Sequence, residues 1–344
     1  MSARRRRALL LAAALTVGTL AAAGPSGSAP GDPAFQSNGL EPDVAIETQT
    51  SSCSHNPPSQ PVQPTTPLAE NSAPVNVTVD GTATVNHTGG TGVTTTTLHL
   101  TGTATAASAG GVFRSADLSA TSAVSSSTPS GDTWCVTQTE ATISSFVHLN
   151  LSVAGYLEVR VSGTGPGPHA SVQLTPGIFG VVLTDVVRGT PGSGTRRLFL
   201  PAGEYSGPMT VGVDWDTRGT MSGTSTASVH LGFTPAGTQT AAQSGKGAKY
   251  ATMTATARSC ASHTVAASVT STKARAKKIK SVTAFVGDHK VLTDKHVKAG
   301  EAYALAVADD QPAPVRLAVT LKPKKHGHKK PKVLETTASY EACS

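Results

Sequence analysis

The segment LKPKKHGHKKPK, from Leu321 to Lys332, holds six lysines and two histidines. His326 and His328 offer two imidazoles to a metal ion, but a metal site usually needs a third ligand, and only lysines lie beside them. Contact with a polyanion suits the segment better, because positive potential attracts anionic partners without a shaped site. The lysines predicted to make that contact are Lys324, Lys325, Lys329 and Lys330.

A second basic cluster precedes this segment in the chain and supports the same chemistry. Exposed lysines also guard sheet edges against pairing with other chains, so an edge-protecting role stays open for both clusters. No aromatic residues are interleaved with the charges, which argues against specific nucleic-acid recognition. The residues of the second cluster are Lys273, Arg275, Lys277, Lys278 and Lys280.

Two aromatic residues, Trp215 and Tyr205, are candidate contacts for a sugar ring. In a chain with only 4% aromatic residues, large rings more often anchor the core. Asp214 and Asp216, with Asp185, offer carboxylates to calcium, but no loop supplies the six or more oxygens that calcium prefers. An exposed strand face is the simpler interpretation of these aspartates.

Catalytic signatures are weak throughout the sequence. No serine lies in a G-x-S-x-G elbow, the histidines are scattered, and no pair of carboxylates stands out as an acid–base couple. The sequence therefore predicts no enzyme, no cofactor and no metal site, and a secreted hydrolase is the least favoured reading.

The N-terminus has the pattern of a secretory signal peptide at residues 1–23. Arg4–Arg7 form a charged region, Ala8–Ala23 are apolar, and the small residues at the end of that run permit cleavage after Ala23. No second apolar run is long enough to span a bilayer. We expect a secreted protein, associated with the cell envelope without a covalent anchor.

Four cysteines suit an oxidising destination and allow three pairings. Cys260 and Cys343 enclose a typical small-domain length, which leaves Cys53 and Cys135 for each other. Each link closes a loop of about 83 residues, worth about 4 to 5 kcal/mol in the chain-entropy model. A zinc site would require clustered cysteines, and the sequence has none.

Strand patterns dominate the mature chain. Val75, Val77 and Val79 alternate with polar residues, and about ten similar segments follow, separated by Gly, Pro or Ser. The fold class predicted is all-β, with a jelly-roll-like sandwich and a smaller Ig-like sandwich. The expected parts are a Pro/Ser-rich arm at 24–73, the larger sandwich at 74–235, a linker at 236–256 and the smaller, basic sandwich at 257–344.

Short motifs in both sandwiches resemble those of secreted and surface proteins of actinobacteria. LPAGEY (Leu200–Tyr205), followed by a long strand and a last strand ending in FTP, is similar to presentation or anchor modules. The Gly287-Asp288 hairpin and the closing SYEAC are similar to small Ig-like domains that end some exported proteins. The resemblance implies no catalytic residues, and the smaller domain lacks the Trp that antibody domains carry.

Charge divides along the same boundary. Residues 24–250 hold 8 basic and 14 acidic residues, a net of −6, whereas residues 251–344 hold 16 and 7, a net of +9. We therefore expect a non-catalytic structural, adhesive or ligand-presenting protein, held by charge near anionic cell-wall polymers. The alternative is a protein that binds carbohydrate of the cell wall or of an external polysaccharide.

Overall fold

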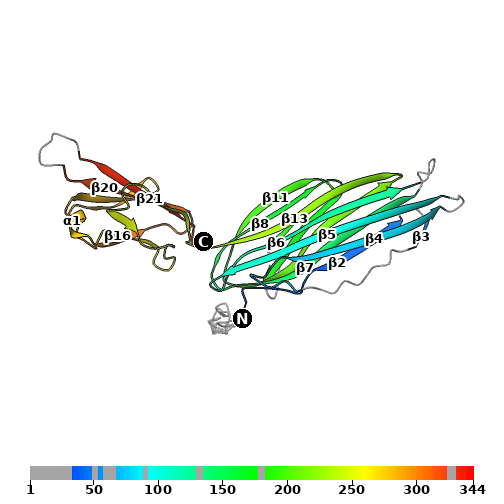
Figure 1. Cartoon of the computed structure of the whole chain (residues 1–344). Helices are drawn as coiled ribbons and strands as arrows, with labels where there is room; N and C mark the ends of the chain where they lie inside the picture. Colours follow the sequence, from blue (N-terminus) through cyan, green and yellow to red (C-terminus); the bar gives the residue numbers. More distant parts are fainter. Residues whose placement is uncertain are drawn as a thin grey trace, which may run out of the picture.

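Two β-sandwiches make up the described part of the chain (Figure 1). We call residues 33–235 the first sandwich and residues 236–344 the second sandwich. In the described residues the only helix is the single turn α1 (Lys273–Ala276), so the predicted all-β class is confirmed. The structure is a computed structural model that describes residues 33–48, 53–56, 67–87, 92–128, 135–176, 183–323 and 331–344.

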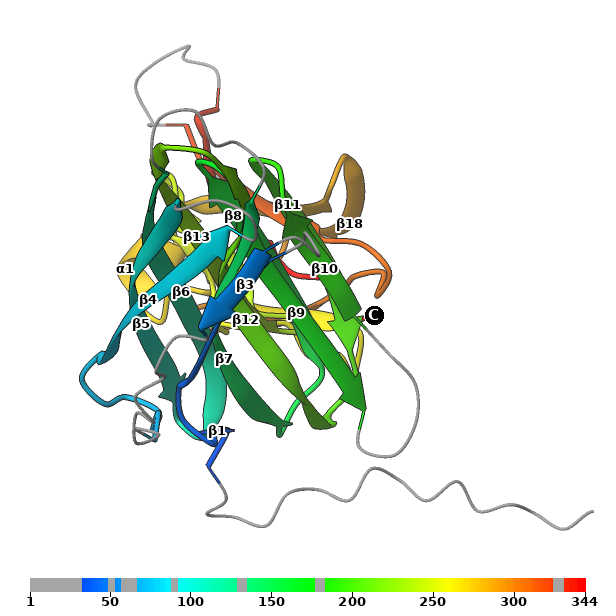
Figure 2. The same cartoon turned by 90° about the vertical axis from the view of Figure 1, so that its right-hand side faces the viewer.

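The first sandwich consists of two antiparallel sheets, whose labelled strands are seen from one end in Figure 2. The six-stranded sheet contains β1 (Phe35–Ser37), β2 (Glu41–Thr48), β7 (Val136–Leu151), β12 (Gly203–Arg218), β9 (Pro168–Pro176) and β10 (Leu183–Arg188). The seven-stranded sheet contains, in spatial order, β11 (Gly192–Leu200), β8 (Gly155–Thr164), β13 (Met221–Pro235), β6 (Val112–Ser127), β5 (Val93–Ala109), β4 (Val75–His87) and β3 (Cys53–Asn56). From β7 to β13 the chain passes repeatedly between the sheets, which suits a jelly-roll-like path.

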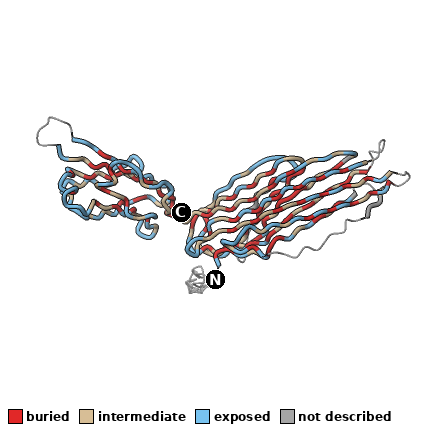
Figure 3. The backbone as a smooth tube through the Cα atoms, in the orientation of Figure 1, coloured by how far each residue is buried: buried red, intermediate tan, exposed pale blue. Residues whose placement is uncertain are grey.

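Alternate residues of the long strands such as β5, β6 and β7 are buried, and the alternation of colours along the tube in Figure 3 shows this. Leu100, Leu157 and Leu231 are 0% exposed and lie in the core between the sheets. The sheets approach closely at Gly102, where a Cβ would lie 2.2 Å from the Cδ1 of Ile143. A larger residue at position 102 would therefore displace the end of the buried Ile143 side chain at the interface between the sheets.

Part of the first core is polar. Thr96 and Thr137 are 0% exposed, yet their hydroxyls are 3.2 Å apart, and Thr137 also hydrogen-bonds to Thr217. Buried hydroxyls are tolerated where they bond to each other, because an unpaired one would lose its hydration without compensation. Small hydroxyl side chains thus fill this region in place of aliphatic ones.

Part of the segment expected to be an arm, residues 24–73, forms strands. Residues 35–48 form β1 and β2, which pair with β7 of the six-stranded sheet. Phe35, Val44 and Ile46 are at most 3% exposed, and Leu68 is also buried. The Pro- and Ser-rich composition concealed these strands, because only a few apolar residues per strand are needed to cover the edge of an existing core.

The second sandwich pairs a five-stranded sheet with a three-stranded sheet. The five-stranded sheet contains β14 (Gln239–Ser244), β21 (Val333–Tyr340), β20 (Ala313–Leu321), β17 (Ile279–Val286) and β18 (His289–Asp294). The three-stranded sheet contains β15 (Ala251–Met253), β16 (Thr264–Val269) and β19 (Ala302–Ala306). Residues 236–256, expected to be a linker, therefore supply β14 and β15, and Ala251 and Met253 lie in the second core.

Both disulfides have the pairing that the sequence favoured. Cys53 is bonded to Cys135, and Cys260 to Cys343. Each bond stays within one sandwich and closes a long loop, of 82 and 83 positions respectively, so each should stabilise its own unit by restricting the unfolded chain.

Polar contacts join the two sandwiches where they meet. Arg197 of β11 forms an ion pair with Glu341, with 2.7 Å between Nη2 and Oε2. The guanidinium of Arg197 also lies 4.3 Å from the ring centroid of Tyr156, whose hydroxyl donates to the carbonyl oxygen of Ser344 at 2.7 Å. Arg197 is partly exposed, so solvent screens this ion pair and weakens the coupling.

The separate cores predict separate unfolding. Leu317→Ala, at a position 0% exposed in the second core, should lower the free energy of unfolding of the second sandwich by about 2 to 5 kcal/mol. Both tryptophans, Trp134 and Trp215, precede residue 236, so the tryptophan-fluorescence transition in denaturant should not move.

The matched control for this experiment is Leu157→Ala, at a position that is 0% exposed in the first core. This variant should shift the fluorescence transition by a similar free energy. Equal fluorescence shifts in the two variants would show that the cores unfold as one unit.

Candidate functional site

The second basic cluster and the described ends of the first basic segment, Lys322 and Lys332, meet at one end of the second sandwich. Strand β17 pairs with β20 so that Ile279 lies opposite Leu321. The backbone N–H of Lys322 donates to the carbonyl oxygen of Lys278 at 2.8 Å, and that of Leu321 donates to Lys332 at 2.8 Å. Residues far apart in sequence are thereby held side by side by backbone hydrogen bonds.

We call this surface the basic end. The basic end surrounds α1, which lies at the end of the second sandwich that points away from the first sandwich (Figure 1). All of its side chains are exposed. Its members are Lys273, Arg275, Lys277, Lys278, Lys280, Lys322 and Lys332.

Burial of two apolar residues fixes the local geometry of the basic end. Ala276 and Ile279 are 5% and 3% exposed and pack into the second core, which leaves the charged neighbours facing water. The carbonyl of Thr272 accepts hydrogen bonds from the N–H groups of Arg275 and Ala276 and begins the single helical turn. The arrangement of the charges is therefore set by the packing beneath them.

No carboxylate forms an ion pair with the basic end among the described residues. The carboxylates of Asp294 and Glu301, in the same domain, are already engaged. Asp294 accepts a hydrogen bond from the hydroxyl of Tyr303, and Glu301 accepts one from the backbone N–H of Lys298, both at 2.7 Å. The positive charge of the basic end is thus available to an external anion.

Four predicted polyanion contacts, Lys324, Lys325, Lys329 and Lys330, lie outside the described residues, as do His326 and His328. They fall between β20 and β21. Lys322, directly after β20, and Lys332, directly before β21, are described.

The two predicted glycan contacts do not form a shared platform. Tyr205 is 6% exposed and its hydroxyl donates to the carbonyl of Pro201 at 3.0 Å, so its ring offers no open face for stacking. Burial raises the pKa of this phenol. Trp215 is half-buried against the first core. Both rings therefore pack against the first core, as large rings in an aromatic-poor chain commonly do.

Of the aspartates considered for calcium, Asp214 is engaged in an ion pair. Asp214 pairs with Arg188, at 2.8 Å between Oδ2 and Nη2, and accepts a hydrogen bond from the side chain of Gln138. Burial raises the pKa of Asp214, but the hydrogen bonds from Arg188 and Gln138 outweigh it and hold the pKa below its usual value. No group of three or more His, Cys, Asp or Glu residues suited to a metal ion occurs within the described ranges.

Three histidine–aspartate pairs at the surface were not predicted from the sequence. His99 contacts Asp80, His230 contacts Asp117 and His263 contacts Asp309, at 2.5 to 2.6 Å. Each pair joins residues that are distant in sequence and lie on neighbouring strands or loops. A local spacing pattern therefore cannot predict it. In the described structure no Ser or Thr hydroxyl hydrogen-bonds to the other ring nitrogen of these histidines, as a nucleophilic triad would require.

Comparison with known proteins adds no family. No protein-family model matches the chain, and no curated protein matches it. Within the described residues, no helix is long and apolar enough to cross a membrane.

The Asp214–Arg188 pair predicts a pH effect. Because the folded pKa of Asp214 is lowered, its contribution to stability is present above its unfolded pKa and is lost as pH falls through the folded pKa. Arg188→Gln should raise the pKa of Asp214 and remove less than about 1 kcal/mol of stability at neutral pH. Titration of the Asp214 carboxyl followed by NMR checks the shift, and Arg160→Gln on the other sheet should leave it unchanged. An unchanged pKa in Arg188→Gln would contradict the assignment.

Proposed function

We propose that this protein is an exported, non-catalytic structural or adhesive protein held at an anionic cell envelope by its basic end. The observation that carries the proposal is the backbone pairing of Lys278 with Lys322, which unites two basic segments on one surface. A single anionic polymer running across that end would then meet charges from α1, β17 and β20 together.

Charge distribution supports an attraction that acts over distance. The net of +9 over residues 251–344 stands against −6 over residues 24–250, so the second sandwich would face the polymer and the first would face away. Positive potential raises the local concentration of anionic partners without a shaped binding site. Such an attraction suits the basic end, where exposed basic side chains surround the buried Ala276 and Ile279.

Export is supported by features that do not involve the basic end. All four cysteines are paired in two disulfides, which form and persist in oxidising compartments. The N-terminal pattern of Arg4–Arg7 and Ala8–Ala23 suits a secretory signal. The same proposal includes association with the cell envelope and a relationship to actinobacterial proteins. It also assigns the first sandwich to the jelly-roll-like class and the second sandwich to the Ig-like class.

If the lysines only protected a sheet edge from pairing with other chains, they would be expected at different positions. Lys280 is the second residue of β17 and Lys322 follows β20. Both β17 and β20 are inner strands of the five-stranded sheet, whose outer strands are β14 and β18. Lysines that only protect an edge are expected on the outer strands. The position of the basic end therefore favours contact with a partner.

Salt and mutation test the proposal together. The triple variant Lys277→Gln, Lys278→Gln and Lys322→Gln should sediment with anionic wall material at least several-fold less than wild type at about 0.1 M salt. Binding of the wild type should fall steeply toward about 1 M salt, because the Debye length shrinks from about 10 Å to about 3 Å.

A control of equal charge separates position from net charge. Lys246→Gln, Lys249→Gln and Lys290→Gln remove three exposed lysines of the same sandwich that lie outside the basic end. This variant should retain most of the binding. Equal loss in both variants, or wild-type binding that persists at high salt, would refute the role of the basic end.

A further inference from the structure

The outer face of the seven-stranded sheet carries ordered rows of hydroxyl groups. Register places five threonines side by side across five neighbouring strands. All of them point away from the core and are exposed or partly exposed. In spatial order from β4 to β8 they are Thr78, Thr101, Thr121, Thr226 and Thr164.

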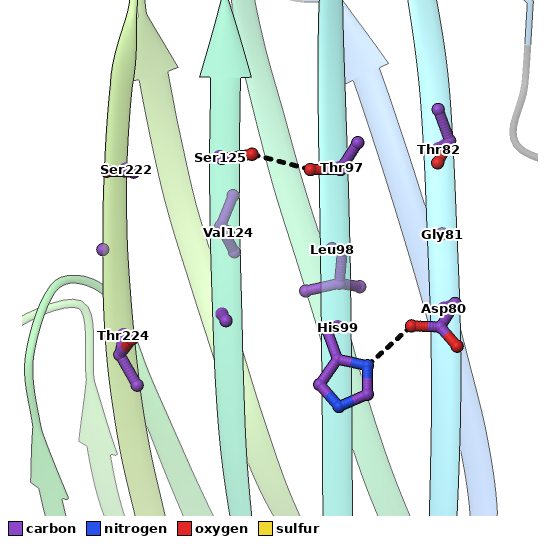
Figure 4. A pocket seen from close by; sticks show the side chains of 12 residues that line it. Asp80, Gly81, Thr82, Thr97, Leu98, His99, Val124, Ser125, Ser222 and Thr224 are labelled. Carbon is purple, nitrogen blue, oxygen red and sulfur yellow. Dashed lines mark hydrogen bonds and ion pairs between the residues drawn. The ribbon is translucent and has the colours of Figure 1, made fainter.

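A hollow of about 440 Å³ lies on this face over β4, β5, β6 and β13 (Figure 4). Its volume falls in the range of about 300 to 1,000 Å³ typical of small-molecule sites. Ala123 forms the low point, because its neighbours across the strands, His99 and Thr224, have larger side chains. A row of hydroxyls borders it, from Thr82, Thr97, Ser125 and Ser222.

The polar groups around the hollow suit a hydroxylated ligand. Thr97 and Ser125 are 2.7 Å apart, yet each hydroxyl keeps lone pairs for another donor. Oδ1 of Asp80 lies 2.6 Å from Nδ1 of His99. The Asp80 carboxylate is largely exposed to solvent. A carboxylate accepts hydrogen bonds from neutral hydroxyls more strongly than a neutral acceptor does.

Charge decides which hydroxylated ligand fits. The lining contains no lysine or arginine, and Asp80 repels an anionic polymer. We infer that this hollow and the hydroxyl rows around it bind a neutral polysaccharide. Hydroxyls on neighbouring strands lie about 4.8 Å apart within a row, and the two rows, four residues apart along each strand, lie about 13 Å apart. They present repeated donors and acceptors to a polymer with repeated hydroxyls. Without stacking rings each contact is weak, and several contacts along one polymer chain provide the affinity.

This inference differs from the sequence-based glycan hypothesis in its residues and from the basic end in its ligand. The hollow involves neither Tyr205 nor Trp215. Binding through hydroxyls does not depend on net charge, so it should persist at about 1 M salt, where attraction by the basic end is screened.

The test is co-sedimentation of the full mature chain with insoluble cellulose, chitin and starch at about 1 M salt. Wild type should bind at least one of these neutral polysaccharides saturably. Ala123→Gln fills the hollow from an exposed position and should weaken that binding about tenfold or more, a loss of about 1.4 kcal/mol. Asp80→Asn keeps the size of the side chain, removes its charge and should cause a several-fold loss.

The control Ala45→Gln makes the same change at a partly exposed position of the opposite sheet and should bind like wild type. Thermal unfolding of each variant establishes that it is folded. Absence of binding to all three polysaccharides, equal binding by Ala123→Gln and wild type, or binding confined to an anionic derivative such as carboxymethyl cellulose would each overturn the inference. None of these outcomes bears on the basic end, which is measured at low salt on anionic material.

Discussion

Burial of alternate side chains between two facing sheets is the constraint on which the rest of the first sandwich depends. In a strand, successive residues point to opposite sides, so each inward residue fixes an outward neighbour. Inward positions such as Leu98 and Val124 are buried, and outward positions such as Thr97 and Ser125 are therefore held at the surface in register. The hydroxyl rows are a consequence of a core built on the other side of the same strands.

Small side chains shape this core. With 4% aromatic residues, the sheets pack largely through Ala, Val, Leu and Thr, and a Cβ at Gly102 would lie 2.2 Å from the Cδ1 of Ile143. Where apolar residues give way to Thr96 and Thr137, hydrogen bonds between buried hydroxyls replace aliphatic packing. A disulfide from β3 to the residue before β7, Cys53–Cys135, links the two sheets.

The two sandwiches differ in what they expose. The second sandwich is small, carries most of the basic residues and displays several of them above the buried Ala276 and Ile279. The first exposes hydroxyls on one sheet and, on the other, carboxylates such as Glu41 and Asp43 of β2. The proposed contacts therefore divide by chemistry, with anionic polymer at one sandwich and neutral polysaccharide at the other.

The sequence by itself determined the all-β class, the charge division and the favoured cysteine pairing, because period, composition and spacing are local properties. Tertiary structure alone placed Phe35, Val44 and Ile46 in the core, joined Lys278 to Lys322 and aligned five threonines in a row. In the run Thr94–Thr97, identical residues alternate between core and surface, so no pattern of letters assigns their faces. Register between distant strands decides such positions, and it depends on contacts that a linear pattern does not contain.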